Sequence, residues 1–302
     1  MTLSNPRLSN QHRLGLVLAV GSATAYSTAG FFTRLIPLDV WSLLFWRGIF
    51  AGSFMLLLML WRRRAARETT QQVPRHMGAP GWLIAGLSTV GMVCFLSALR
   101  AAPVADVALI YAVVPFVTAI LAWLALRERS ALRTIIASLL ALVGVVIMVG
   151  DGWSAGHWRG DLLAFGMTCA MAALTVAIRR FPDVDTLKTA SATCFLGSLI
   201  ALPFADITAV TPVQLLLLAL FGIGQMGLGF LLLVAATRRI SAMESALVGA
   251  LDAPLAPLWV WLAFGETVSS ATLLGGALIL AAVGGDILLA NHPISRKAAA
   301  TG

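Results

Sequence analysis

Two apolar stretches decide the fold of this chain: PFVTAILAWLALRE at residues 115–128 and PLAPLWVWLAFGE at residues 254–266. Each begins at a proline, continues through apolar residues and ends at a glutamate. When Glu128 is aligned with Glu266, Trp123 falls on Trp261. Apolar runs of this kind are typical of helices in lipid or in a protein core. Their occurrence twice, with the same ending, predicts a chain built from two copies of one helical unit.

The composition places these helices in a membrane. Of the 302 residues, 59% are hydrophobic and only 11% are charged, and the mean hydropathy is +0.91. A soluble domain carries about 25% charged residues, so this chain has too few polar side chains to cover a water-facing surface. We expect a multi-pass integral membrane protein whose solvent is the lipid bilayer.

The chain contains ten apolar runs, at residues 14–35, 40–61, 81–100, 103–126, 132–150, 160–180, 189–206, 213–237, 242–264 and 271–291. Strands cross lipid only as closed barrels with alternating polarity, which these runs lack. The first run resembles a signal peptide around Arg13 and Ala23, but it stays apolar to Phe32 and has a counterpart later in the chain. The expected fold is therefore all-α, with ten transmembrane helices.

The second half of the chain repeats the first in two registers. The N-terminal register aligns Gly15 with Gly160, and the residues that then match identical ones are Gly15, Leu18, Ala19, Gly21, Ala25, Arg34 and Pro37. The C-terminal register aligns Trp123 with Trp261. The other residues that it aligns with identical ones in the second half are Arg100, Ala108, Leu109 and Glu128. We interpret residues 14–150 and 160–291 as two five-helix repeats. Because five is odd, the second repeat enters the membrane from the opposite side, as in many secondary transporters.

The charges agree with an inverted repeat whose termini are both cytoplasmic. With that orientation the cytoplasmic segments hold seventeen basic residues, namely Arg7, Arg13, Arg62, Arg63, Arg64, Arg67, Arg75, Arg127, Arg129, Arg133, Arg179, Arg180, Lys188, Arg238, Arg239, Arg296 and Lys297. The opposite side holds three, namely Arg34, Arg100 and Arg159. The positive-inside rule thus accounts for the net charge of +8, and no nucleic-acid partner is expected.

Several kinds of chemistry are excluded. The histidines His12, His76, His157 and His292 lie in loops or tails, so a buried Ser-His protease or haem site is not expected. Neither lysine lies within an apolar run, and no Walker A loop is present. The cysteines Cys94, Cys169 and Cys194 lack metal-ligand spacing. We expect no enzyme, cofactor, metal or disulfide, which leaves transport, conduction or a structural role.

Ionisable residues inside a membrane cost roughly 2.5–3.5 kcal/mol each on insertion scales and so mark candidate sites. Asp252 lies near the middle of the ninth run, on one helical face with Ser245, Gly249 and Trp259. It is interpreted as a substrate or proton site, or alternatively as a buried carboxyl group at a helix contact. Arg47 lies in the second run, where it either binds a carboxylate or extends to the membrane surface.

Polar, aromatic and methionine side chains recur in the other runs. Tyr111, Pro115 and Thr118 share a face of the fourth run, which corresponds to the ninth in the other repeat. We expect a central cavity between the repeats, lined by Tyr26, Arg47, Ser88, Met92, Tyr111, Gln225, Met226, Asp252 and Trp259. Two patterns are interpreted as structural. Glu128 and its equivalent Glu266 are expected to interact with the N-terminus of the following helix, and the stripe of Ala277, Ala281 and Gly285 to form a packing seam.

The two stretches that open this section resemble the ending of the fourth helix in each repeat of the EamA family, part of the drug/metabolite transporter superfamily. The segment from Phe45 to Arg47 also resembles that family's arginine on the second helix. The chain as a whole resembles bacterial aromatic-amino-acid exporters of the YddG type. This resemblance implies an inverted 5+5 fold, a bacterial inner membrane and export of amino acids.

Other substrates and classes stay open at this point. Members of the superfamily also carry nucleosides, nucleotide sugars, drugs and phosphorylated sugars, but a phosphosugar site would need several buried cations and Arg47 alone is available. An ion or water channel and a membrane scaffold are the alternatives from other classes. The sequence leaves the oligomeric state open, a monomer included.

The inverted repeat predicts which loops face the cytoplasm. In a variant without native cysteines, a single cysteine at Thr70 should react with an impermeant thiol reagent only from the cytoplasmic side. A cysteine at Ala155 should react only from the outside. Labelling of Thr70→Cys in intact cells would contradict the inverted arrangement.

Overall fold

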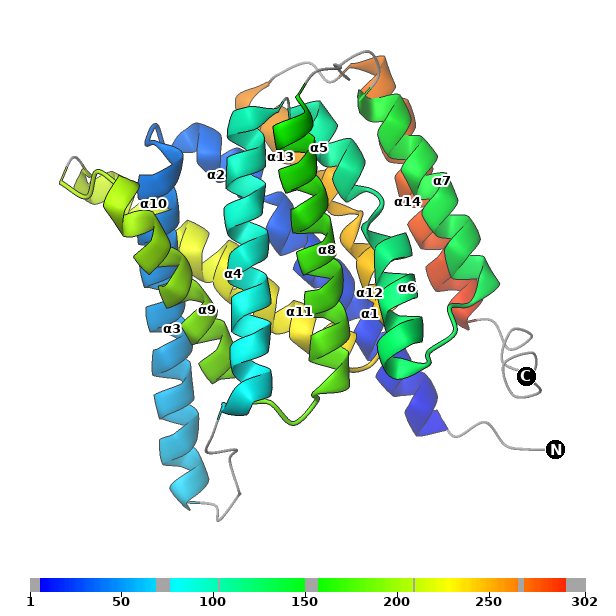
Figure 1. The fold of residues 1–302 in the computed structure, drawn as a ribbon, viewed down its shortest axis with the longest axis horizontal. Coiled ribbons are helices and arrows are strands. Elements are labelled where there is room, and N and C mark those ends of the chain that lie inside the picture. Colours follow the sequence, from blue (N-terminus) through cyan, green and yellow to red (C-terminus); the bar gives the residue numbers. More distant parts are fainter. Residues whose placement is uncertain are drawn as a thin grey trace.

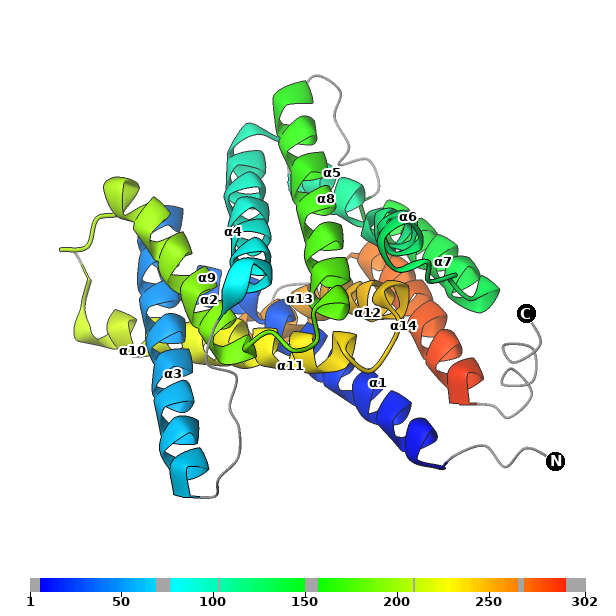
Figure 2. The same cartoon turned by 60° about the horizontal axis from the view of Figure 1, so that its bottom comes forward.

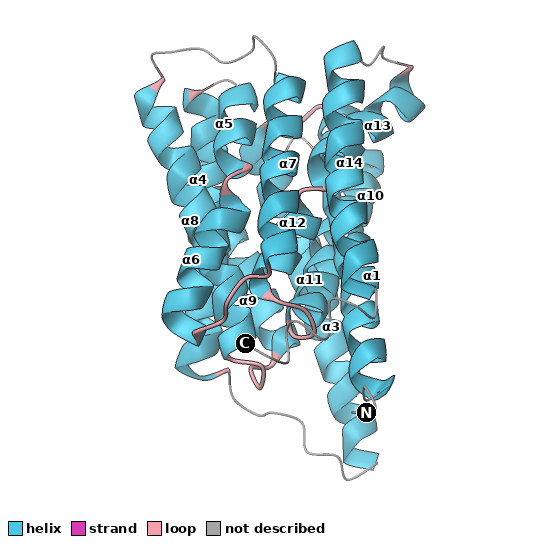
Figure 3. Cartoon of the chain, turned by 90° about the vertical axis from the view of Figure 1, so that its right-hand side faces the viewer, coloured by secondary structure: helices cyan, strands magenta, loops and turns pink. Residues whose placement is uncertain are grey.

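A computed structural model describes residues 6–68, 77–102, 104–149, 157–208, 210–265 and 269–291. Within these ranges all regular structure is helical (Figure 3). The elements are α1 (Pro6–Ser27), α2 (Ala29–Leu35), α3 (Val40–Glu68), α4 (Gly78–Ala101), α5 (Val104–Tyr111), α6 (Val114–Leu126), α7 (Leu132–Val149), α8 (Trp158–Arg180), α9 (Thr186–Ala201), η2 (Leu202–Phe204), α10 (Pro212–Leu220), η3 (Phe221–Leu228), α11 (Gly229–Thr237), α12 (Ala242–Gly249), α13 (Asp252–Phe264) and α14 (Ser270–Asn291).

These elements form ten segments that are long and apolar enough to cross a membrane. The segments are Asn10–Leu35, Val40–Arg62, Gly78–Phe95, Asp106–Leu126, Leu132–Val149, Trp158–Arg180, Leu187–Phe204, Pro212–Thr237, Ala242–Phe264 and Ser270–Leu289. Each coincides with one of the ten apolar runs, so the predicted fold class is confirmed. Several spans contain more than one element, because their helices are interrupted in mid-membrane.

The helix packing follows the internal repeat. The second spans of the two repeats, α3 and α9, pack along each other, as do the fifth spans, α7 and α14 (Figures 1 and 2). The third span of the first repeat, α4, packs on α8, the first span of the second repeat. In the same way α11, which belongs to the third span of the second repeat, packs on α1. Exchanging the two repeats therefore carries these main helix contacts onto one another, as expected for a bundle with an internal two-fold axis.

The element boundaries show the same repeat at single-residue precision. The C-terminal register carries the first residues of α5, α6 and α7 onto the first residues of α12, α13 and α14. It also carries Arg127, which ends α6 with a φ of 55°, onto Gly265, which ends α13 with a φ of 67°. The two copies thus keep one backbone register, although the proline moves from the second position of α6 to the third of α13.

The chain enters and leaves the bundle at the same end, because α1 begins where α14 finishes (Figure 3). An even number of spans requires this arrangement. Residues 69–76 and 150–156, which carry two of the loops used to predict sidedness, lie outside the described residues, as does Glu266. The cytoplasmic position of the termini therefore stays a prediction.

The seam between α7 and α14 is built around two glycines, and not around the predicted alanine stripe. A Cβ atom added to Gly275 would overlap the carbonyl oxygen of Gly144. The next residues on the same face of α14 are the buried Ile279 and Val283, whereas Ala277 and Ala281 are exposed on the opposite face. The expectation for that stripe was wrong because the face of α14 that packs on α7 carries a single glycine followed by Ile279 and Val283, and not the run of small residues.

The seam can be tested with two glycine substitutions in one helix. Gly275→Ala should lower the melting temperature of the purified protein, because overpacking typically costs about 1–3 kcal/mol. Gly284→Ala is the matched control, since an added Cβ meets no atom within 4 Å and alanine favours helix by up to about 1 kcal/mol. Equal melting temperatures for the two variants would contradict this packing.

Candidate functional site

The two fourth spans are broken at equivalent positions in mid-membrane. The fourth span is interrupted between Tyr111 and Val114, and the ninth between Gly249 and Asp252. At the first break the N–H of Val113 bonds to the carbonyl of Ile110 at 3.2 Å, three residues back, and the equivalent bond at the second break is 3.1 Å long. Irregular backbone is tolerated at this depth only where it faces protein or a water-filled space, so both breaks belong to the interior of the bundle.

Two further irregular spans had no signal in the hydrophobic pattern. The first span breaks at Thr28, whose hydroxyl donates to the carbonyl of Ala25 at 2.6 Å and so competes with the helical bonds. The eighth span contains a π-helix from Phe221 to Leu228. Such π-helical turns are rare and occur frequently at functional sites. The glycine-rich sequence of this segment was the one available hint.

Arg47 points into the bundle from α3. Its Nη1 donates to Oε1 of Gln225 at 3.3 Å, its Nη2 to Sδ of Met92 at 3.4 Å, and its Cζ lies 5.3 Å from the centre of the Phe221 ring. The guanidinium is thus held by side chains of the third and eighth spans and does not extend to the membrane surface. Among the described acidic residues, none forms an ion pair with it.

The π-helix brings Gln225 to Arg47 through a close backbone approach. A Cβ atom added to Gly222 would lie 2.5 Å from the carbonyl oxygen of Arg47 and 3.1 Å from Cβ of Phe50. A glycine is therefore needed for η3 to pack directly on α3. This contact also places the Phe221 ring beside the guanidinium, a pairing that the sequence did not predict.

Asp252 is the first residue of α13, directly after the break in the ninth span. Tyr26 on α1 interacts electrostatically with Asp252, with Arg47 and with Tyr111, and Tyr111 interacts with Asp252 as well. All four side chains retain partial solvent accessibility. The fold therefore gathers four of the predicted residues from four different spans, with Tyr26 close to both charged groups and Tyr111 close to Asp252.

Other predicted residues lie farther out or face elsewhere. The indole Nε1 of Trp259 donates to the hydroxyl of Ser27 at 2.8 Å and so joins α13 to the end of α1. Ser245 shares a 2.8 Å hydrogen bond with Thr237 on α11, so the predicted single face of the ninth span is divided by the break. In the fourth span, Thr118 donates to the carbonyl of Val114 in its own helix.

Two predicted residues have weaker ties to this region. Ser88 is buried in α4, and Met226 is half-buried in η3, next to Gln225. Sequence reasoning in turn missed Cys194, a buried thiol on α9 that interacts electrostatically with Arg47. Its position in an apolar run gave no signal beyond packing.

Glu128 does not interact with the helix that follows it, because α7 begins four residues later, at Leu132. Its Oε2 instead accepts a 2.6 Å bond from Nε of Arg179, the next-to-last residue of α8. The expected interaction with the helix dipole was wrong for Glu128, and Glu266 lies outside the described residues. This partner, Arg179, is one of the residues that the two repeats share, since it corresponds to Arg34 in the N-terminal register.

Comparison with known proteins places this arrangement in a family. The model of the EamA-like transporter family matches residues 13–150 and again residues 158–285. A solved structure described as "Crystal structure of protein" is similar with a TM-score of 0.76 and 21% identity, over 92% of this chain and 99% of that chain, and it supports the fold alone. No curated protein is significantly similar in sequence. Two matches that together span nearly the whole chain show that it belongs to the EamA-like transporter family of multi-pass membrane proteins.

Proposed function

We propose that this transporter exports amino acids, aromatic and other neutral or methionine-like ones, together with similar small metabolites. Export would proceed by alternating access through a central cavity between the repeats, across a bacterial inner membrane, as the similarity to YddG-type exporters suggests. The observation that carries the proposal is the arrangement of Arg47 and Asp252. A cation and a carboxyl group lie inside the membrane, both close to Tyr26, without forming an ion pair with each other.

An amino-acid zwitterion supplies the charged partner that each of these groups lacks. A guanidinium binds a carboxylate through two parallel hydrogen bonds, so Arg47 is assigned to the substrate carboxylate. Asp252 is assigned to the substrate ammonium, and the hydroxyls of Tyr26 and Tyr111 to hydrogen bonds between the two ends. A substrate with a single charge would satisfy only one of the two protein groups.

The remaining lining residues favour breadth over affinity. Met92 and Phe221 lie against the guanidinium, with Gln225 and Met226 beside them on the π-helix. Methionine and aromatic side chains repack around apolar groups of different shape. We therefore expect Ser88, Trp259 and these residues to accept several neutral side chains, with modest affinity.

The proposed function predicts saturable transport of neutral amino acids. Proteoliposomes that contain only this protein should take up phenylalanine, and methionine and tryptophan should compete. Phenylalanine amide, which lacks the carboxylate, should compete at least tenfold less well, and Arg47→Lys should raise the KM for phenylalanine by a similar factor because it loses the bidentate contact. Arg129→Gln, at an exposed position, is the control and should transport normally.

Other outcomes would point to other functions. Flux that does not saturate and is not reduced by competitors would indicate a channel. Transport of a nucleoside, a sugar or a drug by protein that ignores amino acids would leave the family assignment intact and refute the proposed substrate class. Phosphorylated sugars should fail to compete, because several cations are needed to bind a phosphate tightly.

Asp252 can be tested with a nearly isosteric change. Asp252→Asn removes the ability to ionise, so it should fold and insert normally while transport, or its dependence on pH, changes. Flux should be measured in proteoliposomes at several pH values, with the amount of inserted protein as the reference. A variant that matches the wild type at every pH would reduce Asp252 to a packing residue at the helix break.

A further inference from the structure

Two histidine–carboxylate contacts are related by the internal repeat. Nε2 of His12 lies 3.8 Å from Oε1 of Glu244, and Nδ1 of His157 lies 3.9 Å from Oδ2 of Asp106. The N-terminal register carries His12 onto His157, and the C-terminal register carries Asp106 onto Glu244. The chain therefore makes one contact twice, with the roles of the two repeats exchanged.

Each contact joins the two repeats at one end of the bundle. His12 lies near the start of the first span and Glu244 in the first turn of α12, which opens the ninth span. His157 directly precedes α8, and Asp106 lies in the first turn of α5, so the second contact joins the sixth and fourth spans. Because the repeats are inverted, the contacts lie at opposite ends, and the predicted topology places His12–Glu244 at the cytoplasmic mouth.

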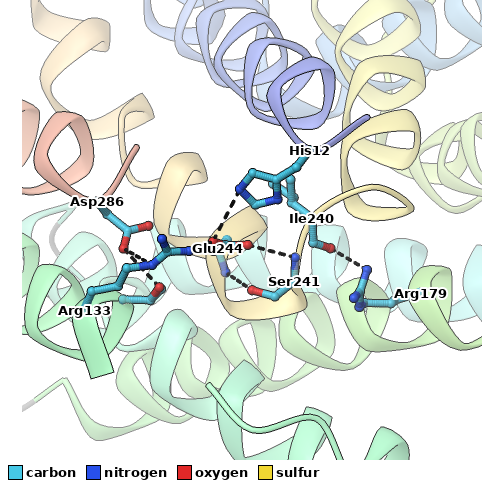
Figure 4. A network of polar contacts seen from close by, with 8 residues as sticks. His12, Arg133, Arg179, Ile240, Ser241, Glu244 and Asp286 are labelled. Atoms are coloured by element: carbon cyan, nitrogen blue, oxygen red, sulfur yellow. Dashed lines mark hydrogen bonds and ion pairs between the residues drawn. The ribbon is translucent and has the colours of Figure 1, made fainter. Parts of the chain in front are cut away.

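The contact at His12 is part of a larger network. Glu244 also accepts a 2.6 Å bond from Nη2 of Arg133 on α7, and Nε of Arg133 lies 3.6 Å from Oδ1 of Asp286 on α14 (Figure 4). Both carboxyl groups are enclosed, since Glu244 is 5% exposed and Asp286 is 2% exposed. A capping box holds Glu244 in place, because its Oε2 accepts from the backbone N–H of Ser241 at 3.1 Å.

Other interactions surround this cluster. Thr134 donates to Oδ1 of Asp286 at 3.0 Å. One residue before the capping box, the carbonyl of Ile240 accepts a 2.5 Å bond from Arg179 (Figure 4). Arg179 also pairs with Glu128. Both Arg133–Glu244 and Arg179–Glu128 link a residue of the first repeat to one of the second. With Arg133–Asp286, three ion pairs thus tie the two repeats together at this end, in addition to the contact between His12 and Glu244.

Two members of this network, Arg133 and Asp286, have no counterpart at the opposite mouth. The C-terminal register carries Arg133 onto Ala271, and the same register pairs Asp286 with Met148 of the first repeat. Alanine and methionine form no ion pair, so the network around Arg133 belongs to one end only. In a symmetric fold, such a difference gives the two mouths unequal stability.

We propose that these two contacts are the paired gates of the transporter, and that Arg133 and Asp286 bias the resting protein toward a closed cytoplasmic mouth. Alternating access requires contacts between the repeats to break at one mouth while those at the other hold. His12–Glu244, with Arg133 and Asp286, holds the cytoplasmic mouth, and His157–Asp106 holds the other. The inference rests on the transport activity of the family and is independent of the amino-acid substrate.

The bias can be measured without any substrate. A cysteine at Tyr111, beside Asp252, reports access to the site in a variant whose native cysteines are replaced. Adding Arg133→Gln should raise its labelling rate from the cytoplasmic side at least fivefold and lower the rate from the outside. Arg129→Gln removes one charge from an exposed position three residues before α7 and should change neither rate. Unchanged rates in the Arg133 variant would overturn the bias.

The gates themselves can be tested by cross-linking. In the same cysteine-free background, a short reversible cross-link between His12→Cys and Glu244→Cys should stop flux, and cleavage of the link should restore it. A cross-link between Asp106→Cys and His157→Cys should likewise stop flux, and its cleavage should restore it. The control pair is Ser269→Cys and Thr272→Cys, whose native oxygens lie 2.9 Å apart at the start of a single helix.

Full flux through protein cross-linked at either mouth would overturn the assignment of that contact as a gate. Cross-linking is read out as flux of whichever substrate the protein carries, whereas labelling at Tyr111→Cys reports the state of the mouths without any substrate. Failure of the gates and failure of the proposed substrate class can therefore be told apart.

Discussion

The structure depends on one constraint, namely that lipid offers no hydrogen bond to a peptide group. Most of the chain meets this constraint with apolar helices. The breaks before Val114, before Asp252 and at Thr28 meet it with three-residue turns and with hydroxyl groups that bond the local backbone. Such turns are stable at this depth only where other helices surround them. The helix breaks are therefore also the positions where a binding site can form.

The same constraint explains why two charged groups survive inside the membrane. Arg47 is surrounded by the amide of Gln225, the sulfur of Met92 and the ring of Phe221, which can solvate a guanidinium without neutralising it. Asp252 lies at a helix break and, like Arg47, is close to Tyr26. If the two groups paired directly, each would lose its capacity to bind a charged ligand. Their separation keeps both groups available.

Much of the fold could be predicted from the sequence because both repeats keep the length of the apolar runs and the spacing between matching residues. The ten spans and the C-terminal register needed no knowledge of contacts. The break at Thr28 and the π-helix at Phe221 could not be read, since they depend on which hydroxyl or glycine meets a neighbouring helix. Glu128 was assigned to the wrong partner for the same reason: its proximity to α7 in sequence was visible, and the distant Arg179 was not.

The repeat supplies the scaffold, and the departures from the repeat supply the candidate chemistry. Arg47 corresponds to Ala192 in the N-terminal register, or to Thr193 if the first residues of α3 and α9 are aligned, and Asp252 corresponds to Val114 in the C-terminal register. Neither charge has a symmetric copy, so a zwitterion would meet one cation and one carboxyl group and would bind in one orientation. Arg133 and Asp286 lack symmetric copies in the same sense. A two-fold bundle with identical halves would have no preferred mouth, and an oriented site with unequal mouths therefore has to come from residues that only one half carries.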